Sequence, residues 1–225
     1  MCAIFGGVET SIFEILYEAN KQRGTFASSV VGLTENDQHV FKKSGGIDFD
    51  KFNYIDNTTY YLGHVQAPTS AKRIWEYDTS HPFESLSWLV SHNGVLTNHS
   101  KLKRRYCSFL ENPVDTAVIV NLLEYFTQLA IAKDKKIKPV KIIKSTLELL
   151  EGTYALSILD CTSNDVYLAR NGSILHYSKA GGYYSSMDGS NLKSVPEGTI
   201  LKLNKKTKKW NKAGTFEFAS PFSFI

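Results

Sequence analysis

Apolar residues follow two different periods along this chain, and the change of period separates predicted strands from predicted helices. An apolar run at residues 3–5 predicts a buried strand, and apolar positions at helical spacing over residues 12–19 predict a helix after it. Ser11 and Glu14 have the spacing of a capping box, so we expect this helix to begin there. Gly24 is expected to end it, because glycine favours the backbone conformation that closes helices.

The middle of the chain predicts strands first and long helices after them. The strands are expected at residues 28–33, near Val40, at 60–65 and at 88–91, the last breaking at His92-Asn93-Gly94. Asn112-Pro113 predicts the start of a long helix. Pro139 predicts the start of a second one, over residues 140–150, which Gly152 closes. The inward side chains of the long helix are expected to be Val118, Leu122, Tyr125, Phe126 and Leu129.

Beyond Gly152 the pattern changes to short strands. They are predicted at residues 154–159, 166–169, 174–177, 183–185 and 200–203. The lysine-rich residues 202–212 are expected to form a turn between strands, and the aromatic residues 216–224 to pack onto the body of the protein. Strands, then paired helices, then strands, without a regular β-α-β alternation, predict an α+β fold with antiparallel sheets.

Composition narrows the class of protein. The chain has 225 residues, 42% of them hydrophobic and 21% charged, which fits one globular domain over residues 1–225. We find no internal repeat and no linker-like stretch. The net charge of +4 is mild and gives little reason to expect a nucleic-acid partner.

The cysteines and the start of the chain bear on its compartment. Cys2, Cys107 and Cys161 are odd in number and form no C-x-x-C motif, which argues against a disulfide framework and against a zinc site. The start lacks the pattern of a signal peptide, and no run approaches the roughly 18 apolar residues of a membrane span. We therefore expect a cytoplasmic protein without membrane contact, metal or other cofactor.

Two positions carry candidate chemistry, and each has a structural alternative. Removal of Met1 would give Cys2 a thiol nucleophile and an α-amine whose reference pKa, about 7.7–8.0, suits a general base. Cys2 is equally explained as a buried residue opening a core strand. Asn93-Gly94 offers a carboxamide and a backbone N–H for an oxyanion, or simply the commonest dipeptide of a tight hairpin turn.

A series of short motifs runs along nearly the whole chain. They are residues 1–7 (MCAIFGG), 22–24 (QRG), 63–69 (GHVQAPT), 81–83 (HPF), 92–99 (HNGVLTNH), 115–119 (DTAVI), 150–155 (LEGTYA), 168–173 (LARNGS) and 196–199 (PEGT). Each motif is weak alone. In order, spacing and coverage, the series resembles the glutaminase domain of class II glutamine amidotransferases, which are N-terminal-nucleophile (Ntn) hydrolases.

This resemblance implies a four-layer αββα sandwich of two antiparallel sheets. It also implies hydrolysis of the glutamine side-chain amide to glutamate and ammonia through a thioester on Cys2, with the Cys2 amine moving protons. Asn93 and the Gly94 N–H would hold the oxyanion. Asp115 matches the family residue that binds the substrate α-amino group, and Thr69 one that lines the pocket.

One position departs from the family pattern. The family commonly has an arginine where this chain has Gln66, and that arginine holds the α-carboxylate of glutamine. A glutamine side chain cannot reproduce a bidentate, charged contact, so Lys72 or Arg73 would have to substitute for it. Three further matches, for which we expect structural roles, are His81, His92 and Asp188.

The resemblance leaves three functions open. The first is a free-standing glutaminase without a synthase domain, which supplies ammonia to a separate synthase subunit. The second is an N-terminal-cysteine amidohydrolase for a different amide, which Gln66 would permit. The third is a non-catalytic regulatory module of the same fold, against which the presence of Cys2, Asn93 and Asp115 argues.

Overall fold

The computed structural model describes residues 2–67 and 74–218. Its α-helices are α1 (Thr10–Asn20), α2 (His99–Tyr106), α3 (Asp115–Ala132) and α4 (Pro139–Leu147). The first strands are β1 (Ala3–Gly7), β2 (Ala27–Leu33), β3 (Gln38–Ser44), β4 (Tyr60–Gln66), β5 (Phe83–Glu84) and β6 (Trp88–Leu96). The later strands are β7 (Gly152–Asp160), β8 (Asp165–Asn171), β9 (His176–Ser178), β10 (Tyr184–Ser185), β11 (Leu192–Ser194), β12 (Thr199–Asn204) and β13 (Lys209–Thr215).

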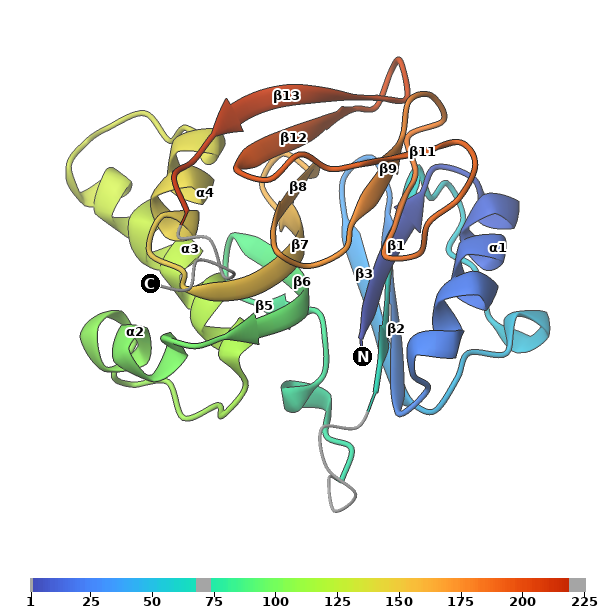
Figure 1. Cartoon of the computed structure of the whole chain (residues 1–225), viewed down its shortest axis with the longest axis horizontal. Helices are drawn as coiled ribbons and strands as arrows, with labels where there is room; N and C mark the ends of the chain where they lie inside the picture. The colour runs from blue at the N-terminus through green and yellow to red at the C-terminus, as the bar shows by residue number, and fades with distance from the viewer. Residues whose placement is uncertain (1, 68–73, 219–225) are drawn as a thin grey trace.

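These strands form two sheets with helices outside both. One sheet has the order β11-β9-β10-β1-β4-β2-β3 and the other β13-β12-β8-β7-β6-β5, and neighbouring strands in each run antiparallel. α1 lies outside the first sheet and α2, α3 and α4 lie outside the second, so the layers follow in the order α, β, β, α (Figure 1). The predicted α+β fold with two antiparallel sheets is confirmed.

The side chains of β1 show how the layers are built. Successive residues of a strand point to opposite faces. Ala3 and Phe5 pack beneath α1, whereas Ile4 packs between the sheets with Leu62 of β4 and Leu168 of β8. Ile4 therefore lies on the inner face of β1. The same alternation puts Cys2, which directly precedes the strand, on that side.

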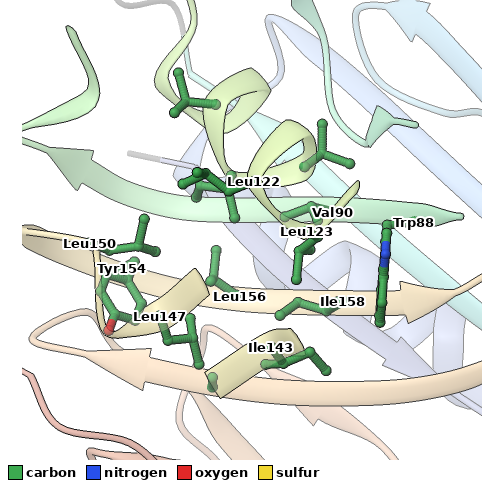
Figure 2. Packing of buried hydrophobic residues seen from close by; sticks show 14 of the residues in the cluster. Trp88, Val90, Leu122, Leu123, Ile143, Leu147, Leu150, Tyr154, Leu156 and Ile158 are labelled. Atoms are coloured by element: carbon green, nitrogen blue, oxygen red, sulfur yellow. The ribbon is translucent and has the colours of Figure 1, made fainter. Parts of the chain in front are cut away.

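The outer face of the second sheet is covered by the apolar faces of α3 and α4. Figure 2 shows Leu122 and Leu123 of α3 lying over Val90 of β6, with Leu156 and Ile158 of β7 and Ile143 of α4 alongside. All of these side chains are buried, and burial of one such side chain contributes about 1.5–3 kcal/mol. This packing fixes α3, and with it the residues at its first turn, against β6.

The largest difference from the sequence-based prediction lies in β6. The strand does not break at His92-Asn93-Gly94 but continues to Leu96, with Asn93 opposite Ala155 and Gly94 opposite Tyr154 of β7. The hairpin-turn interpretation of Asn93-Gly94 is therefore wrong. Pairing with a long partner strand can keep an Asn-Gly pair extended. A prediction from local turn preference takes no account of such a partner.

Smaller differences concern helix ends and the second half of the chain. Ser11 lies inside α1 and the N-cap residue Glu9 makes no side-chain capping bond, so the predicted capping box is wrong. Tyr125 is 39% exposed and contacts Tyr106 of α2 instead of the core. α2 and β13 were not predicted, because their many basic residues mask short apolar faces. In the described part of the chain no helix has the length and apolarity to cross a membrane.

Candidate active site

Cys2 lies immediately ahead of β1, at the end of the first sheet where β4 finishes. Ala3 pairs with Val65, so Cys2 stands level with Gln66. The Cys2 carbonyl accepts a hydrogen bond from Arg23 Nε at 2.9 Å. Because Ala3 faces α1, alternation places Cys2 on the inner face, toward the second sheet. The residue is half-buried.

Gly24 allows the chain to pass close to this end of β4. A 3₁₀ turn, Lys21–Arg23, follows α1, and Gly24 has φ 155°. A Cβ on Gly24 would lie 2.5 Å from the backbone of Ala67, so any larger residue would push the two segments apart. This contact holds the Arg23 side chain where it reaches Cys2.

Asn93 and Gly94 are consecutive residues of β6, and the Asn93 side chain faces the first sheet. His92 contacts Thr116 of α3 on the outer side, so its neighbour Asn93 points to the inner side, where β1 crosses against β6. Asn93 is buried and Gly94 is exposed. Gly94 has φ 152°, and a Cβ there would lie 2.1 Å from Thr153 O. Close strand pairing, not a turn, requires glycine at this position.

Asp115 is the first residue of α3 and joins that helix to β6. Its Oδ2 accepts from the Leu96 N–H at 2.9 Å, and its Oδ1 lies 3.6 Å from His92 Nδ1. Burial alone would raise the pKa of Asp115. The hydrogen bond and charge of His92, with the N–H groups of Leu96 and Thr116, outweigh burial and lower that pKa to about 2.

Three buried histidines lie behind these residues. His64 Nε2 is 3.3 Å from His92 O, and the His64 and His81 rings stack with their centroids 4.0 Å apart. His81 Nε2 and His92 Nδ1 both lie 3.0 Å from the hydroxyl of Thr116. His81 and His92 thus tie β4, β6 and α3 together. Asp188, in contrast, lies in a turn far along the chain, where it accepts from the Gly189 N–H.

A cavity of about 670 Å³ brings part of the predicted site together. Gly94 and Asp115 both line it, with Glu76 and His99, which sequence reasoning did not select. Its other lining residues are Ile74, Thr79, Val95, Leu96, Pro113 and Val114. Glu76 lies in a connecting segment outside every motif, and His99, the last residue of the motif at 92–99, opens α2 and had no role assigned to it. Thr69, Lys72 and Arg73 lie outside the described residues. Among the described residues no cluster of three His, Cys, Asp or Glu is placed to hold a metal ion.

Curated proteins resemble the chain in sequence, although over part of their length. No family model matches it. It is 31% identical over 197 residues to the glutamine–fructose-6-phosphate aminotransferase (isomerizing) of Geobacillus kaustophilus, over 81% of this chain and 31% of that protein. It is 32% identical over 187 residues to the enzyme of the same name from Staphylococcus epidermidis, over 78% of this chain and 30% of that protein. The chain thus spans about a third of the length of these curated relatives.

Solved structures share the fold at lower identity. The glutamine phosphoribosylpyrophosphate amidotransferase of B. subtilis matches with a TM-score of 0.70 and 19% identity, over 94% of this chain and 49% of that one. A predicted glutamine amidotransferase from Pseudomonas aeruginosa matches with a TM-score of 0.53 and 10% identity, over 95% of both chains. Taken with the sequence relatives, this fold places the chain among the class II glutamine amidotransferases, as a domain of the Ntn-hydrolase type.

Proposed function

We propose that this domain hydrolyses the side-chain amide of glutamine to glutamate and ammonia, with Cys2 as the nucleophile. The observation that carries the proposal is that Gly94 and Asp115, from different elements, line one cavity, and that Asn93 directly precedes Gly94 on β6. Cys2 directly precedes β1 of the opposing sheet, and alternation along the chain puts its side chain on the inner face. Nucleophile, oxyanion donors and an anion for the substrate amine are the parts that amide hydrolysis needs.

The roles follow from the chemistry of each group. The Cys2 amine takes the thiol proton as the sulfur adds to the amide carbon, and the resulting oxyanion is held by the Asn93 carboxamide and the Gly94 N–H. The C–N bond then breaks, and the amine passes this proton to the departing ammonia. Water adds to the thioester and gives one proton to the amine, the C–S bond breaks, the amine returns the proton to the sulfur, and glutamate leaves. Asp115, whose pKa is about 2, is ionised at neutral pH and pairs with the substrate ammonium.

This mechanism needs an unblocked amine on Cys2, so whatever precedes Cys2 must first be removed. A glutamine-analogue electrophile tests it directly. We expect one covalent adduct, located at Cys2 by peptide mass spectrometry, and none on Cys2→Ala. Cys107→Ala is the matched control, because Cys107 is fully buried and burial raises the pKa of its thiol. An adduct on Cys107, or an unlabelled wild type with a free Cys2 amine, would contradict the proposal.

We further propose that the ammonia passes to a synthase active site, on a separate subunit. The relatives named above are aminotransferases and amidotransferases, which use an amide nitrogen for synthesis. Purification of the protein at its native abundance, followed by identification of co-purifying enzymes, tests this step. Ammonia release that no co-purifying enzyme stimulates would contradict it while leaving glutamine hydrolysis intact.

A second candidate substrate is an amide without a free α-carboxylate, and Gln66 favours it. Gln66 is 2% exposed and lies two residues from His64, on the same inner face of β4. Its carboxamide is neutral, so it gives a carboxylate no charged partner. We expect Gln66→Arg to tighten glutamine binding by about 1.5–3 kcal/mol if free glutamine is the substrate.

Kinetics on glutamine and on an α-carboxyl-blocked glutamine separate the two substrates. Faster turnover of the blocked amide by the wild type, with no gain from Gln66→Arg, would favour the second candidate. Tight binding of glutamine by the wild type that is lost in Arg73→Ala would show that Arg73 replaces the family arginine.

A further inference from the structure

The hydroxyl of Thr116 is the point at which the two halves of the candidate site meet. Thr116 follows Asp115 at the start of α3, and it contacts His92, which precedes Asn93 on β6. Its side chain is fully buried. A single hydroxyl therefore links the residue next to the proposed amine-binding group with the residue next to the proposed oxyanion donor.

Three polar atoms surround this oxygen. His81 Nε2 and His92 Nδ1 each lie 3.0 Å from Thr116 Oγ1, and Asp115 Oδ1 lies 3.4 Å from it. His92 Nδ1 is also 3.6 Å from Asp115 Oδ1. The first two distances are those of good hydrogen bonds, and the third is long.

Counting hydrogens shows which of these groups can donate a hydrogen bond and which can only accept one. A hydroxyl has one hydrogen and can accept two, whereas an ionised carboxylate only accepts. If the Thr116 hydrogen points to Asp115, both imidazole nitrogens must donate to the hydroxyl. If it points to one imidazole, the other must donate. In the first case the hydroxyl bonds all three partners; in the second it bonds both imidazoles, and Asp115 keeps the Leu96 N–H as a donor. In either case the two imidazoles keep these hydrogen bonds only while the hydroxyl is present, and satisfied buried networks are rigid.

We propose that Thr116 is a positioning residue that holds Asp115 and the Asn93 segment of β6 in a single geometry, so that amine binding and oxyanion stabilisation depend on each other. This inference rests on the proposed glutaminase function. It goes beyond it by assigning a role to a side chain that touches neither the substrate nor the nucleophile. Without the hydroxyl, the two buried imidazoles lose a partner and α3 can shift relative to β6.

The test compares Thr116→Val, which keeps the shape of the side chain and removes the hydroxyl, with Thr116→Ser, which keeps the hydroxyl. Thr127→Val is the matched control: Thr127 is a buried residue of the same helix whose hydroxyl is bonded to Trp88 Nε1 at 2.9 Å. Circular dichroism and thermal unfolding first establish that each variant is folded. Steady-state kinetics on glutamine then give kcat and KM separately.

We expect Thr116→Val to lower kcat/KM by about ten- to a hundredfold, because displacement of a site by 1 Å has effects of that size. Both parameters should change, with a higher KM through Asp115 and a lower kcat through Asn93. Thr116→Ser should restore most of the loss, and Thr127→Val should lose stability without losing kcat/KM.

The outcomes separate this inference from the function on which it rests. A wild type that neither hydrolyses glutamine nor is labelled at Cys2 would overturn the function and the inference with it. An active wild type whose Thr116→Val variant keeps normal kcat and KM would overturn the inference alone. An equal loss of kcat/KM in Thr127→Val, or no rescue by Thr116→Ser, would show that Thr116 acts only through stability and would also overturn it.

Discussion

Asn93 combines two properties that a residue used in catalysis and not in folding should have. It lies on the inner face of β6, and backbone pairing with Ala155 holds it there, so removal of its side chain leaves that pairing in place. We expect Asn93→Ala to lower kcat for glutamine by about two to three orders of magnitude and to change KM much less, because an oxyanion donor acts mainly in the transition state. Steady-state kinetics on the folded variant measure both. A raised KM with unchanged kcat would assign Asn93 to substrate binding instead.

At the same scale, sequence reasoning placed some site residues better than others. It selected Asp115 and Gly94, which line one cavity, by matching motifs. It did not select Glu76, which lies outside every motif. His99 and Thr116 lie inside two of the matched motifs, but neither was given a role, because their places near Asp115 and His92 arise from the packing of α2 and α3 against β6. A motif match in a single sequence does not show which of its residues tertiary packing brings together.

Among the elements, β6 has the most specific requirement. Gly94 combines φ 152° with a Cβ position 2.1 Å from Thr153 O, whereas Gly45 has φ 77° with open space around it. We expect Gly45→Ala to destabilise the protein by about 1–2 kcal/mol through backbone strain alone. Gly94→Ala should cost more, since β6 and β7 must separate. Urea unfolding of both variants measures the difference, and equal losses would show that β7 yields easily at Thr153.

α3 and β6 are also joined through the Asp115 carboxylate, whose contribution to stability depends on pH. The pKa of Asp115 is lowered to about 2 in the folded protein from the ordinary 3.8 of an aspartate, and its side chain is 17% exposed. A carboxyl with a depressed folded pKa contributes stability above its unfolded pKa, and that contribution is lost as pH falls through the folded pKa. The wild type should therefore exceed Asp115→Asn by about 2 kcal/mol at pH 7, and this excess should vanish between about pH 4 and pH 2. An excess that persists at pH 2 would contradict the assignment.

Element prediction succeeded where apolar residues dominate a strand or recur at helical spacing. The predicted strand at 60–65 corresponds to β4, and the predicted helix after Pro139 to α4, although α4 ends at Leu147. It failed at His92-Asn93-Gly94, where pairing with β7 overrides the turn preference of Asn-Gly. It also failed at β13, where Lys209 and Lys212 accompany the buried Trp210.

At the scale of the whole molecule, an ion pair joins an edge strand of one sheet to an edge strand of the other. Lys42 of β3 lies 3.0 Å from Glu84 of β5, and its side chain is only 4% exposed. Burial lowers the pKa of Lys42, an effect that Glu84 opposes. We expect Glu84→Ala to lower the free energy of unfolding by about 1–2 kcal/mol, because it removes the carboxylate partner of a buried ammonium. Lys42→Met should lower it less, because it removes the buried charge as well. A double-mutant cycle by thermal unfolding tests this, and additive losses would show that the pair is not coupled.

The central place of β1 in its sheet has a consequence for how the protein matures. β10 and β4 flank β1 on either side, and the Ile4 N–H is bonded to Ser186 Oγ at 3.0 Å. Pairing on both sides holds β1 from Ala3 onward, and none of these contacts needs a free amine on Cys2. An untrimmed copy is thus expected to fold fully and remain dormant. The active share of a preparation then reports how many copies have been trimmed, and folding assays alone will not reveal it.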